Sequence, residues 1–321
     1  MYSDVPALRN GRALLWHDPG RLDRLDLRWG TGGRSLAPRA PFTMLKEDGS
    51  GTTPKVLVRD AAGRQWSVKF GKEVSPDVFG SRVAWALGYY AEPSYYVAEG
   101  TFRHAVALKR LENYIDAAGH FKRARFQLRS KYPEYLADVG WSWTKNPFAG
   151  THQLNGLKIL MMLLSNWDDK DIDDALKRGS NTAIYREGNT YLFFVNDWGA
   201  ALGDWGHGPT RYMWYISRSK WDCKDYAHQT GKFVKVEDGR LDWGYRGTHS
   251  KSMTDGVTPA DIAWIMSYLG RLTDRQVHAA LLASGATAAE AACYTEAIQW
   301  RIAQLAEVSG YRADRIVARR R

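Results

Sequence analysis

A glycine-containing loop is the first of four segments whose side chains could take part in phosphate chemistry. It reads "EDGSGTTPK" and spans residues 47 to 55. Its candidate phosphate-binding residues are Gly49, Ser50, Gly51, Thr52, Thr53 and Lys55. Glycines let backbone amides approach a phosphate closely, and the hydroxyls could donate to it. A flexible surface turn would use the same residues, and the loop taken alone favours that simpler interpretation.

The second segment is "WSVKFG", in which Lys69 stands between Val68 and Phe70. Its apolar neighbours are those expected of a central strand. A buried ammonium needs an anionic partner, because an unpaired buried charge is costly, and a nucleotide phosphate would serve. For a lone strand lysine, exposure to solvent by alternation is the simpler interpretation.

The third segment, "SNWDDKDIDDALKRGSN" at 165–181, places Asp168, Lys170 and Asn181 near one another along the chain. Phosphoryl transfer needs a carboxylate to orient the acceptor hydroxyl, a cation beside the transferring group and a side chain that holds Mg²⁺. All three types occur here. An acidic surface loop or a calcium site is the alternative, although "DDKDIDD" lacks the glycine at position six of an EF-hand loop.

The tripeptide Asp-Trp-Gly occurs three times and forms the fourth feature. Asp197 follows the apolar run "YLFFVN" and comes one hairpin after Asn181, so the two side chains could share a metal ion. Asp204 and Asp242 have no such strand before them. The sequence therefore predicts one metal-binding copy and two chance copies with hydrated carboxylates in loops.

Regular elements should position these segments. Two hairpins are predicted, at 55–71 and at 181–197, and an apolar helix is predicted in 151–167. Ser75 is the expected N-cap of a helix in 75–90, with Pro76 at its first position. Three further helices follow residue 258, where Thr258 with Asp261, and Thr287 with Glu290, have the spacing of capping boxes.

Composition restricts the class of protein. The 321 residues carry a net charge of +10, which favours an anionic partner and leaves a nucleic-acid-binding protein as one alternative. The longest apolar runs are too short for a membrane span, and the first residues lack the features of a secretory signal. The two cysteines show no spacing typical of zinc or of a redox pair, so we expect a reduced, cytoplasmic protein.

The order of these motifs resembles the atypical kinases, in particular the HipA-like and phosphoinositide-kinase-like branch of the protein-kinase-like fold. The resemblance spans about residues 42 to 206 and is carried by "GSGTTPK", "SVKFG", "NWDDK", "NTAIY" and "NDWGAALG". It implies an α+β, two-lobed fold that binds ATP and Mg²⁺. The implied organisation is an N-terminal extension at 1–41, a β-rich lobe at 42–112 and a mostly helical lobe at 113–321.

The resemblance also implies roles for individual residues. Lys69 would contact the α and β phosphates, and the glycine loop would cover the phosphates. Asp168 would orient or deprotonate the acceptor, while Lys170 would neutralise charge on the transferring group. Asn181 and Asp197 would bind Mg²⁺. Adenine would lie near 108–112, where the two lobes would join.

Several positions depart from the family pattern. Asn166-Trp167 replaces the usual His-Arg, and Asp173 has the five-residue spacing from Asp168 at which the family has its metal-binding asparagine. Glu73 and Asp77 are both close to the helix start, which leaves the partner of Lys69 open.

The expected activity is transfer of the terminal phosphoryl group of ATP to an unknown hydroxyl acceptor, a protein or a small molecule. A pseudokinase-type nucleotide-binding module and a basic nucleic-acid-binding protein are the alternatives, and transfer of adenylate also stays open.

Overall fold

The computed structural model describes residues 11–49, 53–105, 109–128, 134–136, 139–169, 181–206 and 218–311. The strands are β1 (Arg12–Leu14), β2 (Phe42–Asp48), β3 (Lys55–Arg59), β4 (Gln65–Lys69), β5 (Ser94–Arg103), β6 (His120–Leu128), β7 (Glu134–Tyr135), β8 (Thr182–Glu187), β9 (Thr190–Val195), β10 (Val234–Glu237) and β11 (Arg240–Trp243). The α-helices are α1 (Val74–Ala86), α2 (His152–Leu163), α5 (Cys223–His228), α6 (Ser250–Thr254), α7 (Pro259–Leu269), α8 (Asp274–Leu282) and α9 (Ala288–Ser309). Three short 3-10 helices are η3 (Leu22–Arg24), η4 (Gly30–Gly32) and η5 (Thr230–Lys232).

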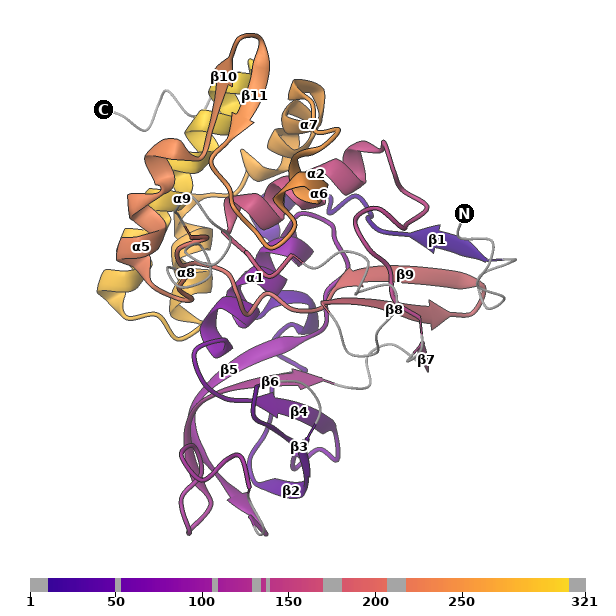
Figure 1. Ribbon diagram of the computed structural model, residues 1–321. Helices are drawn as coiled ribbons and strands as arrows, with labels where there is room; N and C mark the ends of the chain where they lie inside the picture. Colours follow the sequence, from indigo (N-terminus) through magenta and orange to yellow (C-terminus); the bar gives the residue numbers. More distant parts are fainter. Residues whose placement is uncertain are drawn as a thin grey trace.

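Five strands close into a barrel in the order β2-β3-β4-β6-β5, at the bottom of Figure 1. Closure depends on β2, which pairs antiparallel with β3 and also runs parallel to β5 through Phe42 and Phe102. Inward positions of these strands carry large apolar side chains, among them Trp66 and Phe126, which are fully buried. Alternate residues of β3 fill the barrel interior, whereas β4 is buried on both faces from Trp66 to Lys69.

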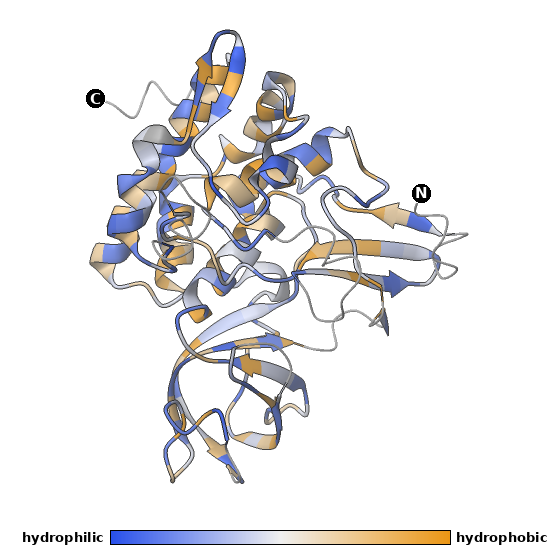
Figure 2. Ribbon diagram, viewed as in Figure 1, coloured by the Kyte–Doolittle hydropathy of each residue, from blue (hydrophilic) through white to orange (hydrophobic). Residues whose placement is uncertain are grey.

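A second sheet has the order β1-β9-β8-β7. Its central hairpin, β8 and β9, matches the prediction for 181–197, and its edge strand β1 runs parallel to β9. Figure 2 shows the hydrophobic character of β9, in which all positions from Tyr191 to Val195 are buried. A strand covered on both faces has such a continuous apolar run.

The two-lobed protein-kinase-like fold predicted from the motif order is wrong, although the structure is α+β. The strands expected to form the β-rich lobe of a kinase-like fold close into a five-stranded barrel. Residues 12–14 of the predicted extension belong to the second sheet, beside β9. The barrel also continues past residue 112, because β6 pairs with both β4 and β5.

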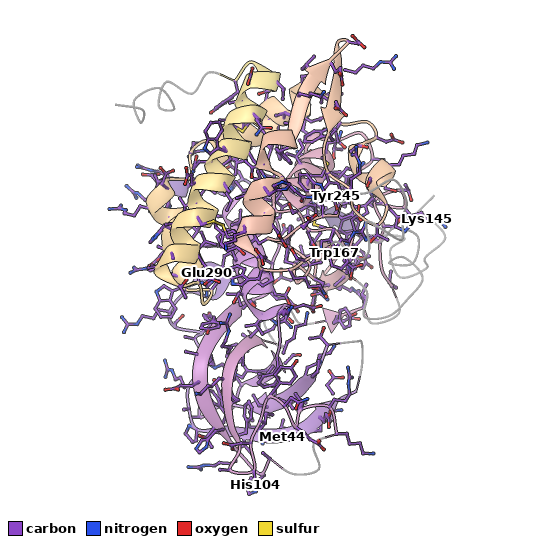
Figure 3. The ribbon with its side chains drawn as sticks, turned by 60° about the vertical axis from the view of Figure 1, so that its left-hand side comes forward. Met44, His104, Lys145, Trp167, Tyr245 and Glu290 are labelled. Carbon is purple, nitrogen blue, oxygen red and sulfur yellow. A yellow bond between two sulfur atoms is a disulfide. The ribbon has the colours of Figure 1, made fainter. Side chains whose placement is uncertain are left out.

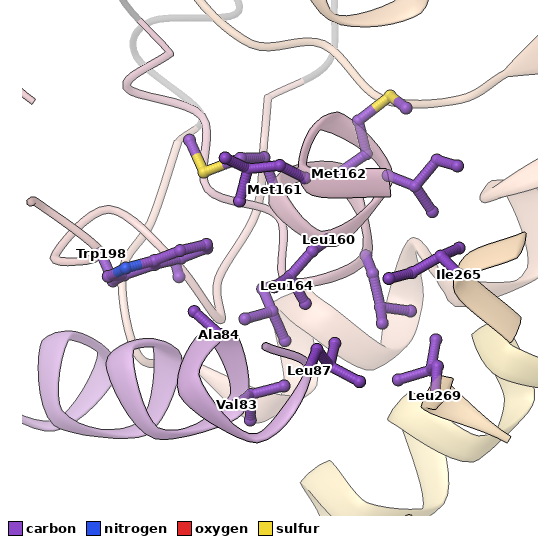
Figure 4. Packing of buried hydrophobic residues seen from close by; sticks show 14 of the residues in the cluster. Val83, Ala84, Leu87, Leu160, Met161, Met162, Leu164, Trp198, Ile265 and Leu269 are labelled. Carbon is purple, nitrogen blue, oxygen red and sulfur yellow. The ribbon is translucent and has the colours of Figure 1, made fainter. Parts of the chain in front are cut away.

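The helices surround a separate apolar core with α2 at its centre. Figure 4 shows Leu87 at the end of α1 and Leu160 and Leu164 at α2, facing Ile265 and Leu269 of α7. Ten of the twelve residues of α2 are buried, among them the polar Asn155 and Lys158, which agrees with the central place that its strongly apolar sequence predicts. The two predicted capping boxes are present and begin α7 and α9.

Two further features concern the chain as a whole. Cys223 of α5 and Cys293 of α9 form a disulfide, so the expectation of unpaired cysteines is wrong. The prediction failed because 70 residues separate the two cysteines, and only the packing of α5 against α9 brings them together. Within the described ranges, no helix combines the length and apolar character that crossing a membrane requires.

Candidate functional site

Lys69 lies at the centre of a buried group of charges where the barrel meets α1. Its side chain is 8% exposed, so the solvent-facing interpretation is wrong. The Nζ atom is 2.9 Å from Asp77 Oδ2, 3.1 Å from Glu73 Oε2 and 3.5 Å from Asp197 Oδ2. Both carboxylates near the helix start are therefore partners of Lys69, which answers the question that the sequence left open.

The start of α1 places these two carboxylates. Gly71, two residues after the end of β4, has φ +91°, and the Val74 amide donates to its carbonyl, so the chain turns into the helix within a few residues. The helix begins at Val74 with Glu73 as its N-cap, slightly earlier than the predicted cap at Ser75. Glu73 and Asp77 then stand one turn apart and face the end of β4.

The first Asp-Trp-Gly copy contacts the same helix. The Trp198 amide donates to Asp77 Oδ1 (2.9 Å), and the Gly199 amide donates to Asp197 Oδ1 (2.8 Å). A Cβ atom on Gly80 of α1 would lie 2.6 Å from Cβ of Trp198, so the helix and the turn meet at a distance that only glycine permits. This contact fixes Asp197 beside Lys69.

Arg125 of β6 completes the charge group. Its Nη1 atom donates to Asp77 Oδ2 (2.7 Å), the same oxygen that Lys69 contacts. Burial by itself would lower the pKa of Lys69, but the charges of Asp197, Asp77 and Glu73 outweigh this effect and raise it. Burial likewise opposes ionisation of Glu73, yet Lys69 and Lys220 lower its pKa to about 2.

Asp197 differs from the other carboxylates of the group. Its pKa is raised by burial and by the charges of Asp77 and Glu73, which together exceed the opposite effect of Lys69. About a third of its side chain nevertheless remains exposed, against 2% for Asp77. Asp197 is therefore the carboxylate of this group that a ligand could reach.

The described part of the predicted phosphate loop reaches the same place. Thr53 Oγ1 donates to Glu73 Oε2 (2.7 Å), and Lys55 is the cross-strand partner of Lys69. Burial lowers the pKa of Lys55, while the Asp48 carboxylate acts in the opposite direction. Gly49 accepts at its carbonyl from Arg110 Nη1 (3.2 Å). Ser50, Gly51 and Thr52 lie outside the described residues.

Asp168 and Asn181 lie next to one another. The side-chain amide of Asn181 donates to the backbone carbonyl of Asp168, and Asn181 is buried. Asn166 joins this segment to the metal candidate, because its Nδ2 atom donates to the Asp197 carbonyl (3.0 Å). Lys170 and Asp173 fall outside the described residues.

Residues 245–249 hold residues 166–169 in place. Tyr245 Oη donates to the Asn166 carbonyl (2.6 Å), and the Thr248 amide donates to the Trp167 carbonyl (2.8 Å). The His249 amide donates to Asp169 Oδ1 (3.0 Å). Figure 3 shows Trp167 and Tyr245 in the helical part of the molecule, away from Met44 and His104 of the barrel.

A small polar cavity borders the charge group, and its lining consists of Asp77, Ser81, Glu92, Ser94, Arg125, Gln127, Val195, Asn196 and Trp198. Three nearly fully buried side chains at this cavity, those of Ser94, Arg125 and Trp198, each retain a polar atom without a hydrogen-bond partner among the described residues. Buried donors are normally satisfied, so the cavity is suited to a polar group.

Residues 108–112 were predicted to contact adenine at a junction between two lobes, but their described part lies elsewhere in the fold. It lies in the connection from β5 to β6, within the barrel. The amides of Lys109 and Arg110 donate to Glu47, and Leu111 is buried in the barrel core. This segment is not a junction between lobes, because the strands on both sides of it belong to one sheet.

The other two Asp-Trp-Gly copies differ from each other. Asp204 is 5% exposed and accepts at Oδ1 from the Gly206 amide and from Gln229 Nε2 (2.5 Å). The prediction of a hydrated loop carboxylate is therefore wrong for Asp204. Asp242 lies in strand β11 rather than in a loop, and its exposed carboxylate is 3.6 Å from Lys235.

Sequence reasoning missed three residues of the site: Arg125, Asn166 and Lys220. Lys220 Nζ lies 2.6 Å from Glu73 Oε1, although 147 residues separate them. Nothing in the sequence indicates this contact or the pairing of Arg125 with Asp77. Asn166 stood out only as a departure from the kinase pattern.

The described residues contain no preformed metal site. In the described part of the chain, no group of three or more His, Cys, Asp or Glu side chains is arranged to hold a metal ion. Mg²⁺ bound together with a nucleotide needs only one or two protein ligands, the remainder being phosphate oxygens and water. The partly exposed Asp197 carboxylate fits that smaller requirement, and the Asn181 carbonyl accepts from the amide of Asn196, the residue before Asp197.

Comparison with known proteins found no matching family model, no matching curated protein and no matching solved structure.

Proposed function

We propose that the protein binds ATP together with Mg²⁺ and transfers the terminal phosphoryl group to a hydroxyl acceptor. The observation that carries the proposal is the charge group around Lys69. Two lysines, Lys55 and Lys69, are cross-strand neighbours beside the reachable carboxylate of Asp197. Adjacent cations next to a metal-ligand candidate form the kind of site that suits a polyphosphate with its metal ion.

The residues of the site divide between binding of the phosphates and binding of the metal ion. Lys69, Lys55 and the 49–53 loop hold the phosphates, and Asp197 with Asn181 holds Mg²⁺. When bound, ATP supplies the transferable group and Mg²⁺ neutralises its charge. Because Lys69 already contacts three carboxylates, a phosphate oxygen would replace its longest contact, the one to Asp197 at 3.5 Å.

Asp168 is the proposed base. Its carboxylate orients the acceptor hydroxyl and takes up its proton as the acceptor oxygen bonds to the terminal phosphorus. The bond between that phosphorus and the oxygen bridging to the β phosphate breaks, and ADP leaves with the bridging oxygen. Asn181 holds the Asp168 carbonyl, and the 245–249 segment holds the Trp167 carbonyl and the Asp169 side chain, so the main chain that carries the proposed base is anchored.

A nucleotide-binding module that performs no transfer is the second candidate. The observation favouring it is that Lys69 and Arg125 both pair with Asp77 in a buried network. Such a network can be purely structural. A nucleic-acid-binding role rests on net charge and aromatic content, without a recognised binding motif, and comes third.

The acceptor is a protein or small-molecule hydroxyl in this proposal. A cytoplasmic location is not part of it, because the Cys223–Cys293 disulfide is typical of oxidising compartments.

The proposal is tested by titrating the full chain with a non-hydrolysable ATP analogue, with and without Mg²⁺, and by following ADP release from ATP. Saturable binding that Mg²⁺ strengthens, together with ADP release, supports transfer. Binding without any ADP release moves the conclusion to the second candidate. Absence of nucleotide binding under both conditions rejects both, and salt-sensitive binding of generic nucleic acid would then favour the third.

A further inference from the structure

We propose that Lys220 is an additional phosphate-binding residue, which leaves Glu73 when the polyphosphate of a nucleotide enters the site. This inference rests on the proposed function and adds a residue that the motif order does not include. Lys220 comes from the segment between Asp204 and helix α5, far from the glycine loop and from strand β4 in the sequence.

Glu73 connects Lys220 to the proposed phosphate site. Its Oε1 atom is 2.6 Å from Lys220 Nζ. Its Oε2 atom accepts from Thr53 Oγ1 at 2.7 Å and lies 3.1 Å from Lys69 Nζ. The Glu73 carboxylate therefore contacts Thr53 at the end of the glycine loop, Lys69 and Lys220. All three would lie within reach of one polyphosphate.

Lys220 also lies beside the segment of the proposed base. Its Nζ atom is 5.2 Å from the ring centroid of Trp167, the residue that precedes Asp168. The indole Nε1 of Trp167 donates to the carbonyl of Ser219 (3.0 Å), which fixes the two segments against each other. A cation with these neighbours stands where charge on the transferring phosphoryl group needs stabilisation.

Among the cations of the group for which ion pairs are described, Lys220 is the one best able to change partner. The side chains of Lys69 and Arg125 are 8% and 5% exposed, whereas that of Lys220 is 27% exposed. Lysine carries its charge on a flexible stem, so a rotation of the side chain suffices to redirect it. After Lys220 has moved away, Glu73 still contacts Lys69 and Thr53, so its charge remains paired.

The backbone around Lys220 is well anchored. The Ser219 amide donates to the Asp204 carbonyl (3.1 Å), and the Trp221 and Asp222 amides donate to the carbonyls of Ala201 and Leu202. The exchange of partners therefore needs no movement of the main chain.

The test is calorimetric titration of the full chain with ATP, ADP and AMP in the presence of Mg²⁺. Lys220→Ala is compared with Lys220→Arg and with Lys224→Ala. Lys224 is exposed in α5 and makes no described ion pair, so its replacement removes the same charge four residues away. We expect Lys220→Ala to weaken ATP binding about tenfold or more, the scale of one charge-assisted hydrogen bond, and AMP binding less than about threefold. Lys220→Arg should restore most of the ATP affinity, and Lys224→Ala should match the wild type.

The outcomes separate this inference from the proposed function. Wild-type protein that fails to bind ATP rejects the proposed function and the inference with it. If the wild-type protein binds ATP and Lys220→Ala binds it equally tightly, only the role of Lys220 is rejected. An equal loss for ATP and AMP in Lys220→Ala also rejects it, because a residue that only supports the fold would not distinguish the number of phosphates.

Discussion

Lys69 Nζ and Asp77 Oδ2 are 2.9 Å apart, and this ion pair joins the last residue of strand β4 to the first turn of helix α1. Asp77 also accepts from Arg125 of β6 and from the Trp198 amide. The pair is therefore the point at which two barrel strands, one helix and the first Asp-Trp-Gly turn meet. Its removal should affect stability as well as ligand binding.

The first prediction concerns Lys69→Ala. The substitution leaves three carboxylates without their shared cation, so we expect a loss of about 3–5 kcal/mol in the free energy of unfolding at pH 7. Nucleotide binding should be lost with it. Denaturant unfolding and nucleotide titration measure the two effects, and Lys46→Ala, at an exposed position of β2, should change stability by less than about 0.5 kcal/mol.

The stability loss in Lys69→Ala should depend on pH. In the wild type, Lys69 and Lys220 overcome the effect of burial and depress the pKa of Glu73 to about 2. A depressed carboxylate contributes stability above its unfolded pKa and loses that contribution as pH falls towards the folded pKa. The difference between wild type and variant should therefore shrink as pH falls from about 4.5 towards 2. A difference that stays constant over this range would mean that the ion pairs contribute little.

The second prediction concerns Asp168→Asn. The hydrogen bond that the Asn181 side chain donates is accepted by the backbone carbonyl of Asp168, so the substitution leaves this hydrogen bond intact. We expect nucleotide affinity to be retained and the transfer rate to fall by about 10² to 10⁴, the usual effect of a positioned acid–base group. Single-turnover measurement of ADP release tests this. Equal rates for wild type and variant would remove Asp168 from the chemistry.

Local elements of this protein could be predicted from sequence patterns. The hairpins β3–β4 and β8–β9, the buried helix α2 and the capping boxes of α7 and α9 all rest on residues close together in the chain. Periodicity and capping chemistry act over this range, which is why these predictions are confirmed.

Long-range pairing could not be predicted in the same way. The barrel closes because Phe42 of β2 pairs with Phe102 of β5, and β1 pairs with β9 almost 180 residues later. No local pattern encodes either register. The burial of Asp204 has the same origin, since its partner Gln229 comes from a segment after α5. The motif order singled out Lys69 and Asp197, but it predicted neither Arg125 and Lys220 nor the barrel and helix that bring them together.

The third prediction concerns Asp169, which is fully buried beside the proposed base. Burial raises its pKa to about 8, although hydrogen bonds such as that from the His249 amide act in the opposite direction. Because the folded state holds this proton more tightly than the unfolded state, stability should fall as pH rises from about 4 to 8, by up to about 1.4 kcal/mol per pH unit, and level off above 8. Asp169→Asn should remove this dependence. Unfolding curves across this pH range test it, and an unchanged slope in the variant would contradict it.

The fourth prediction concerns the disulfide between α5 and α9. It closes a loop of about 70 residues, for which loop-closure entropy gives a stabilisation of about 4.4 kcal/mol. Cys223→Ala with Cys293→Ala should lower the midpoint of thermal unfolding, and a reducing agent should lower that of the wild type but not that of the double variant. A wild type insensitive to reductant, with thiols that react freely in the native protein, would show that the bond does not form.

The last prediction compares the three Asp-Trp-Gly copies by alanine substitution. Asp197→Ala removes the carboxylate proposed to hold Mg²⁺ and should abolish the magnesium-dependent part of nucleotide stabilisation in a thermal-shift assay. Asp204→Ala leaves the buried Gln229 amide and the Gly206 amide without their acceptor, so it should lower stability by about 1–3 kcal/mol while the ligand-induced shift persists. Asp242→Ala, at an exposed position of β11, should change neither quantity by more than about 0.5 kcal/mol.

The assay separates the three residues because it reports two quantities, the midpoint without ligand and the shift that ligand adds. A variant whose midpoint falls but whose shift remains has lost a structural contact, as expected for Asp204. A variant whose shift disappears has lost a ligand contact, as expected for Asp197, whose carboxylate is partly exposed beside Lys69. If Asp197→Ala keeps its full magnesium-dependent shift, Asp197 is a structural partner of Lys69, and the first Asp-Trp-Gly copy is no more a metal site than the other two.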